Sequence, residues 1–181
     1  MQWETNLKKY IHKNDIEVEL RIGKIRRTGF DTNIGKAAYE RILQNLLCYK
    51  HWTKFYKSTY SEVFYDGFRK NLDTNEVVCK SKLYANNKKL NNVYDIRFSI
   101  NTEVPQNSDD VHSEETHRRE KIRHSFYHSF FRIDITHITN LNSYELELEI
   151  TDLNYAKKHS AIFIIKCLVD ESLNLVSCTN L

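Results

Sequence analysis

The sequence contains only one proline and four glycines among its 181 residues. So few turn and linker residues argue against long disordered segments, and we expect a single domain over residues 1–181. The four cysteines form no Cys-x-x-Cys pair and have no histidine at zinc-finger spacing, which indicates reduced thiols in an intracellular protein.

The sequence also lacks a signal peptide and any apolar run long enough to span a membrane, so we expect no membrane association. Its formal net charge of +3 is too small to indicate nucleic-acid binding by itself. Neither length nor charge indicates an oligomeric state. The distribution of the charges is therefore more informative than their sum.

Two segments far apart in the chain alternate carboxylates with aliphatic residues. Residues 16–22 carry Glu17 and Glu19, and residues 144–150 carry Glu145, Glu147 and Glu149. Successive side chains of a β-strand point to opposite faces, so each segment predicts one carboxylate face and one apolar face.

Basic side chains also lie opposite apolar ones, on the first of these segments and on other predicted strands. These residues are Arg21, Lys80, Lys82, Arg97, Lys121, Arg123 and Arg132. We expect about eight strands, mostly antiparallel, with helices near residues 3–12, 35–49 and 154–176 and a polar loop at 86–92. This composition predicts an α+β fold. If the sheet closes on itself, the charged faces line its interior.

Carboxylates gathered inside a barrel need a counter-charge. Two of them about 5 Å apart repel by roughly 3 kcal/mol at an effective dielectric constant near 20. A divalent cation relieves this repulsion, and oxygen ligands suit Mg²⁺ or Mn²⁺. Lysines and arginines across the interior would bind a multiply charged anion. The residues therefore predict a site in which a metal ion bridges to a polyphosphate.

Five motifs occur in an order that resembles a known family. They are Glu-Val-Glu (17–19), Asp-Ile-Arg-Phe-Ser-Ile-Asn-Thr-Glu (95–103), Lys-Ile-Arg-His-Ser-Phe (121–126), Arg-Ile-Asp-Ile-Thr (132–136) and Tyr-Glu-Leu-Glu-Leu-Glu (144–149). The chain resembles, from about residue 16 to 150, the metal-dependent RNA triphosphatases of fungal, protozoan and large-DNA-virus mRNA capping systems. These enzymes belong to the triphosphate tunnel metalloenzymes.

This resemblance implies an eight-stranded antiparallel β-barrel, the triphosphate tunnel, with flanking helices. It implies hydrolysis of the γ-phosphate from the 5′-triphosphate end of nascent mRNA, which leaves a 5′-diphosphate end. The implied metal ligands are Glu17, Glu19 and Glu149, and the metal is Mg²⁺ or Mn²⁺. The implied catalytic residues are Glu147, with Glu145 behind it, for the attacking water, and Lys121 and Arg123 for the phosphates.

The resemblance also implies substrate contacts around the tunnel. They are Arg97 on the wall, Glu103 on the same segment, and Arg132 and Asp134, which orient neighbouring side chains or contact phosphate. Lys80, Lys82 and Arg69 join this set, although residues 52–84 match no motif of the family. Local alternatives remain for some of these residues: a solvent face for Glu145, a structural ion pair for Asp134, and plain surface positions for Lys80 and Lys82.

Two other functions are compatible with these residues. The first is a tunnel enzyme acting on tripolyphosphate, thiamine triphosphate or a nucleoside triphosphate. Enzymes of that branch usually have Glu-x-Glu-x-Lys on the first strand, where this chain has Arg21. The second is a non-catalytic RNA-binding or capping-scaffold domain. For the RNA triphosphatase, we expect a separate guanylyltransferase chain as partner, in the nucleus or a viral replication compartment.

Overall fold

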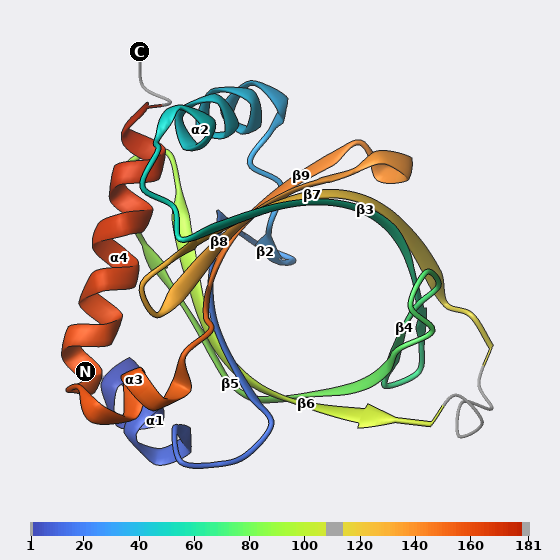
Figure 1. Cartoon of the computed structure of the whole chain (residues 1–181), viewed down its shortest axis with the longest axis horizontal. Coiled ribbons are helices and arrows are strands. Elements are labelled where there is room, and N and C mark those ends of the chain that lie inside the picture. Colours follow the sequence, from blue (N-terminus) through green and yellow to red (C-terminus); the bar gives the residue numbers. More distant parts are fainter. Residues whose placement is uncertain (1, 108–113, 179–181) are drawn as a thin grey trace.

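The computed structural model describes residues 2–107 and 114–178. Within them, eight antiparallel strands close into a barrel in the order β1-β6-β5-β4-β3-β7-β8-β9, and β9 pairs with β1 (Figure 1). The strands are β1 (Ile16–Arg26), β3 (Lys54–Tyr65), β4 (Phe68–Asn71), β5 (Val77–Lys89), β6 (Asp95–Gln106), β7 (His117–His128), β8 (Phe131–Ile138) and β9 (Ser143–Ile150). The expected eight-stranded barrel is confirmed. A ninth strand, β2 (Gly29–Asp31), pairs with the end of β1 outside the ring.

Helices cover one side of this barrel. They are α1 (Gln2–Tyr10), α2 (Lys36–Cys48), α3 (Leu153–Lys158) and α4 (Ala161–Ser177), and a 3₁₀ turn, η2 (Thr139–Leu141), joins β8 to β9. Figure 1 shows α4 along the barrel wall, with α1 and α3 near one of its ends and α2 near the other. In the described part of the chain, no helix combines the length and apolar character needed to cross a membrane.

The hydrophobic core lies between these helices and the outer surface of the barrel. Leu20, Ile133 and Leu148 are completely buried there, and the Trp3 ring of α1 stacks on Phe98 of β6 with 5.1 Å between ring centroids. Because the apolar faces of β1, β6, β8 and β9 pack outward against the helices, their opposite faces point into the barrel. The charged faces therefore line the interior, as the alternation predicts.

The register between β1 and β9 aligns their charged residues. Glu19 lies opposite Glu149, and Arg21 lies opposite Glu147. Directly opposite residues in an antiparallel pair share a face, so these four side chains all point into the barrel. Two strands that are far apart in sequence thus form one continuous charged wall.

Two local expectations are wrong. Residues 86–92 are not all loop, because β5 continues to Lys89 after a register shift between Lys82 and Tyr84. Asn86 accepts a hydrogen bond from Trp3 Nε1 at 2.9 Å, and Asn87 accepts one from Arg97 Nε at 2.9 Å. Hydrogen bonds from other elements thus pair the side chains of these two polar residues within a strand.

The expected closing helix at 154–176 is divided into α3 and α4. Ser160 begins the second helix as its N-cap, since its hydroxyl accepts a hydrogen bond from the backbone N–H of Phe163 at 3.3 Å. This break lets α3 turn away before α4 packs along the barrel.

Candidate active site

The barrel encloses a cavity of about 480 Å³. Every residue predicted for the site lines this cavity except Asp134. The lining members of that set are Glu17, Glu19, Arg69, Lys80, Lys82, Arg97, Glu103, Lys121, Arg123, Arg132, Glu145, Glu147 and Glu149. The structure therefore gathers residues from seven strands around one space. These strands are β1, β4, β5, β6, β7, β8 and β9.

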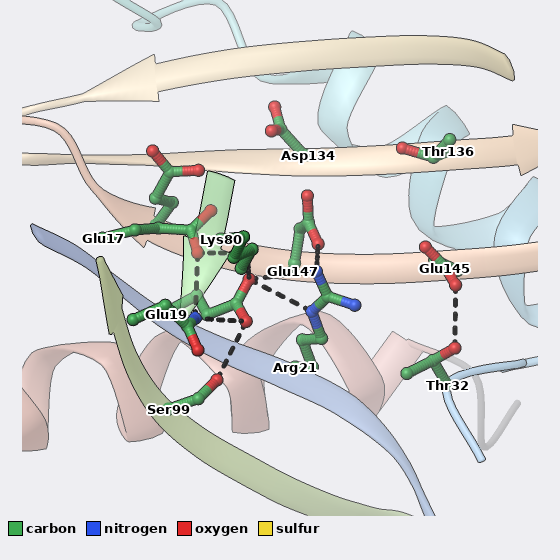
Figure 2. Close-up of polar contacts among 12 residues, drawn as sticks. Glu17, Glu19, Arg21, Thr32, Lys80, Ser99, Asp134, Thr136, Glu145 and Glu147 are labelled. Atoms are coloured by element: carbon green, nitrogen blue, oxygen red, sulfur yellow. Dashed lines mark hydrogen bonds and ion pairs between the residues drawn. The ribbon is translucent and has the colours of Figure 1, made fainter. Parts of the chain in front are cut away.

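The three predicted metal ligands lie side by side on one wall. Glu19 is opposite Glu149, and Glu17 is two residues before Glu19 on the same face of β1. The Lys80 ammonium contacts Glu17 and lies 3.9 Å from Glu19 (Figure 2). Arg132 Nη2 donates to a Glu149 oxygen at 2.6 Å. Basic side chains thus lie against this carboxylate group.

Burial makes the ionised forms of two of these carboxylates costly. It raises the pKa of Glu17, and the neighbouring Glu19 raises it further. Burial likewise raises the pKa of Glu149 to about 8, against the opposing effect of Arg132. A cation held by these oxygens would favour the ionised forms, so charge and position both fit a divalent metal.

The arrangement of side chains is not itself a coordination shell. Among the described residues, no three His, Cys, Asp or Glu side chains converge as metal ligands. To bind a metal, Glu17, Glu19 and Glu149 would exchange their contacts with Lys80 and Arg132 for bonds to the ion.

Glu147 lies between two guanidinium groups. Arg21 Nη2 is 3.1 Å from one of its oxygens, and Arg123 Nη2 is 3.2 Å from the other. Figure 2 shows the contact of Arg21 with Glu147. Burial alone would raise the pKa of Glu147, but Arg21 and Arg123 together hold it well below the usual value. A carboxylate that stays ionised can accept hydrogen bonds from a water molecule, but it is a weak base.

Glu145 is buried, so it does not occupy a solvent face. It accepts a hydrogen bond from the Thr32 hydroxyl at 2.8 Å (Figure 2), and Arg119 Nη1 lies 3.6 Å away. Thr32 belongs to the connection between β2 and α2, which β2 brings to this end of the barrel. Glu145 therefore joins the barrel interior to a segment outside the ring.

Lys121 lies in the most enclosed part of the basic wall. It is 4% exposed and contacts Glu62 at 2.5 Å. Arg69 lies 3.1 Å from Glu103 and 3.8 Å from Glu62. Burial lowers the pKa of Lys121, although Glu62 opposes that effect. Glu62 thus balances two cations that would otherwise repel each other.

Asp134 has no exposed surface and does not line the cavity. Its oxygens accept hydrogen bonds from Arg132 Nε at 2.8 Å and from the Ser125 hydroxyl at 2.6 Å, and Arg123 Nη1 lies 3.3 Å away. It fixes the orientation of the two arginines from behind. The structure thus favours the orienting role of Asp134 over direct contact with a substrate.

Lys82 and Arg97 extend the basic lining on the β5–β6 side of the cavity. Arg97 donates to the neutral Asn87 side chain, and its guanidinium lies 4.7 Å from the centre of the Phe30 ring. Neither partner carries a negative charge, so the charge of Arg97 remains available to an anion. Lys82 is exposed yet lines the same cavity, so its side chain lies where it can contact a bound anion.

Sequence reasoning missed several residues of this site. Among them are Glu62, Ser99, Asn101 and Arg119, whereas Arg21 is predicted on the interior face but without a role in the site. Arg119 carried a usable signal, because it shares the face of Lys121 and Arg123. The strand phase around Glu62 is ambiguous, so only the pairing of β3 with β7 reveals its contact with Lys121.

Comparison with known proteins agrees with this geometry. Residues 89–163 match the family model described as mRNA capping enzyme, beta chain. That segment contains β6 to β9, and hence Arg97, Lys121, Arg123 and Glu147. No curated protein sequence matches the chain significantly.

Solved structures show the same fold. The RNA triphosphatase Pct1 of S. pombe is 17% identical, with 95% of this chain and 90% of that chain covered and a TM-score of 0.74. Pct1 in complex with the Spt5 CTD is similar, at 16% identity, 95% and 91% coverage and a TM-score of 0.75. The RNA triphosphatase domain of a trifunctional mimivirus mRNA capping enzyme is 20% identical, with 99% and 96% covered and a TM-score of 0.62. Residues 89–163 are thus similar to that capping-enzyme family, and the whole chain shares its barrel fold with these solved RNA triphosphatase structures.

Proposed function

We propose that this chain hydrolyses the γ-phosphate from the 5′-triphosphate end of RNA and leaves a 5′-diphosphate end for capping. The observation that carries the proposal is the barrel interior, where a carboxylate wall faces basic side chains across one cavity. Such a cavity suits a polyphosphate together with a cation, and it lies partly in the segment that matches the capping family.

In this proposal Glu17, Glu19 and Glu149 hold Mg²⁺ or Mn²⁺. When bound, the ion neutralises charge on the phosphate oxygens and lowers the pKa of coordinated water. Lys121 and Arg123 bind the phosphate oxygens and stabilise the negative charge that grows on them in the transition state. Glu147 orients the attacking water, and Asp134 keeps the Arg123 guanidinium in place.

Arg97 and Lys82 bind the remaining phosphates on the β5–β6 side of the cavity. The lining also includes the carboxylates of Glu103 and Glu145. Glu103 pairs with Arg69 and Glu145 with Arg119, and these pairs reduce the repulsion between the basic side chains. A non-catalytic scaffold would not require an ionised carboxylate held between two arginines, as Glu147 is.

The diphosphate product is the substrate of a guanylyltransferase, which we propose is a separate chain, acting in the nucleus or a viral replication compartment. The relative Pct1 has been solved with the Spt5 CTD. A comparable CTD segment would bind this chain, and that binding would be measured separately from hydrolysis.

The proposal is tested by phosphate release from RNA carrying a labelled γ-phosphate, with Mg²⁺ or Mn²⁺, beside ATP and tripolyphosphate. Glu149→Gln keeps the shape of the side chain but removes its charge, and we expect a loss of about 100-fold or more in kcat. The matched control is Glu40→Gln, because Glu40 lies exposed on α2. Circular dichroism would establish that both variants are folded.

Full activity of Glu149→Gln would contradict its role as a ligand. Rapid turnover of tripolyphosphate with negligible release from RNA would instead assign the chain to the tripolyphosphatase branch. No release from any of the three substrates would favour the scaffold.

A further inference from the structure

One mouth of the tunnel carries a row of flat side chains. Phe64, near the end of β3, lies opposite His117 at the start of β7, and their rings stack at 4.3 Å with an interplanar angle of 8°. The Arg119 guanidinium lies 5.2 Å from the centre of the Phe64 ring. We call Arg119, Phe64 and His117 the mouth stack. It extends from the cavity, which Arg119 and Phe64 line, to solvent, where His117 is exposed.

Arg119 has hydrogen-bonding capacity to spare. Its Nε is buried and has no hydrogen-bond partner among the described residues. Its Nη1 is 3.6 Å from Glu145, which is longer than a hydrogen bond. A buried donor without a partner costs free energy, so a ligand oxygen that reached Arg119 would relieve that cost. This makes Arg119 an anion-binding group on the inner side of the mouth stack.

His117 presents a flat, neutral ring on the outer side. Burial lowers its pKa, and the positive charge of Arg119 lowers it further. The ring is therefore uncharged at neutral pH. One face stacks on Phe64, while the residue as a whole is exposed to solvent. Single-stranded RNA is commonly held by stacking of its unpaired bases on aromatic and histidine side chains.

We propose that the mouth stack is the subsite for the first nucleoside of the substrate. The base stacks on His117, Phe64 supports that ring from behind, and Arg119 contacts the phosphate nearest the nucleoside. The triphosphate then enters the tunnel from this mouth, toward Lys121 and Arg123, which follow Arg119 on the same face of β7. The inference rests on the proposed function and defines the substrate as a nucleoside-bearing triphosphate.

If the mouth stack binds a base, its loss affects substrates that carry a base and spares those that do not. A ring pair with only a structural role would not discriminate between the two. Tripolyphosphate has no base, so its binding is independent of His117. We expect His117→Ala to raise KM for triphosphate-ended RNA by roughly 5- to 100-fold, with KM for tripolyphosphate changed by about twofold or less. His117→Phe restores a flat ring and is expected to restore most of the RNA affinity.

The control is Phe163→Ala, which removes an exposed ring beside His159 on the far side of the barrel wall. It should leave both KM values unchanged. A second readout is the fluorescence of RNA whose first base is 2-aminopurine, since stacking quenches that base. Wild-type protein should quench it, and His117→Ala should quench it less.

Equal changes in KM for RNA and tripolyphosphate would show that the ring pair only supports the barrel and would overturn the proposal. An unchanged KM for RNA with unchanged quenching would also overturn it. If wild-type protein cleaves tripolyphosphate and ATP but not RNA, the proposed function fails on its own. The mouth stack is then judged by whether His117→Ala raises KM for ATP.

Discussion

Replacing Asp134 by asparagine should destabilise the protein by about 3–5 kcal/mol, because it leaves two partly buried cations without their common, fully buried partner. Asp134 is completely buried, whereas Arg123 and Arg132 are 17% and 23% exposed at their side chains. The asparagine keeps the size of the side chain. Its effect therefore reports the charge and not a cavity.

The magnitude follows from the two distances. Asp134 lies 3.3 Å from Arg123 and 2.8 Å from Arg132. At an effective dielectric constant near 20, these separations correspond to roughly 5 and 6 kcal/mol of attraction. Desolvation of the three ions offsets several kcal/mol for each, so the gross attraction greatly exceeds the net contribution. Truncating one partner in such a buried group leaves the few kcal/mol stated above.

Urea denaturation followed by circular dichroism would measure this loss, and the midpoint of thermal unfolding should fall by roughly 6–20 °C for a chain of this size. The control is Asp66→Asn at the exposed tip between β3 and β4, expected within about 0.5 kcal/mol of wild type. A loss below about 1 kcal/mol for Asp134→Asn, accompanied by loss of phosphate release, would refute the orienting role and favour direct substrate contact.

Two further predictions concern the charged wall and the strand outside the ring. Gly23→Ala would place a methyl group 2.1 Å from the backbone oxygen of Asp31, so β2 must shift; we expect about 1–3 kcal/mol of destabilisation, measured by urea denaturation. For Glu147, the pKa is lowered on folding, so its stabilising contribution is present above the unfolded value near 4.3 and is lost as pH falls below it. The free energy of unfolding of Glu147→Gln should therefore fall less than that of wild type between about pH 5 and pH 2. An equal fall for the two proteins over this range would contradict the prediction.

The sequence by itself determined the alternation along the strands, and with it the separation of charged and apolar side chains onto opposite faces. In residues 16–22 and 144–150, the period of two puts the glutamates on one face and the aliphatic residues on the other. This property depends only on backbone geometry, so it survives in any fold that keeps the strands. It puts Glu17 and Glu19 on one face of their strand and Lys121 and Arg123 on one face of theirs. That Glu149 acts together with Glu17 and Glu19 is what the resemblance to the RNA triphosphatases implies.

Only the tertiary structure decided which of these faces is inside and which partner each charge has. Closure of β9 against β1 turns the charged faces inward and the apolar faces toward the helices. Ion pairs such as Lys121 with Glu62 depend on register between strands more than fifty residues apart. The position of Asp134 behind the arginines and the stacking of Phe64 on His117 have the same origin. Register and closure are non-local, because they are set by the packing of the whole barrel and not by the period of any one segment.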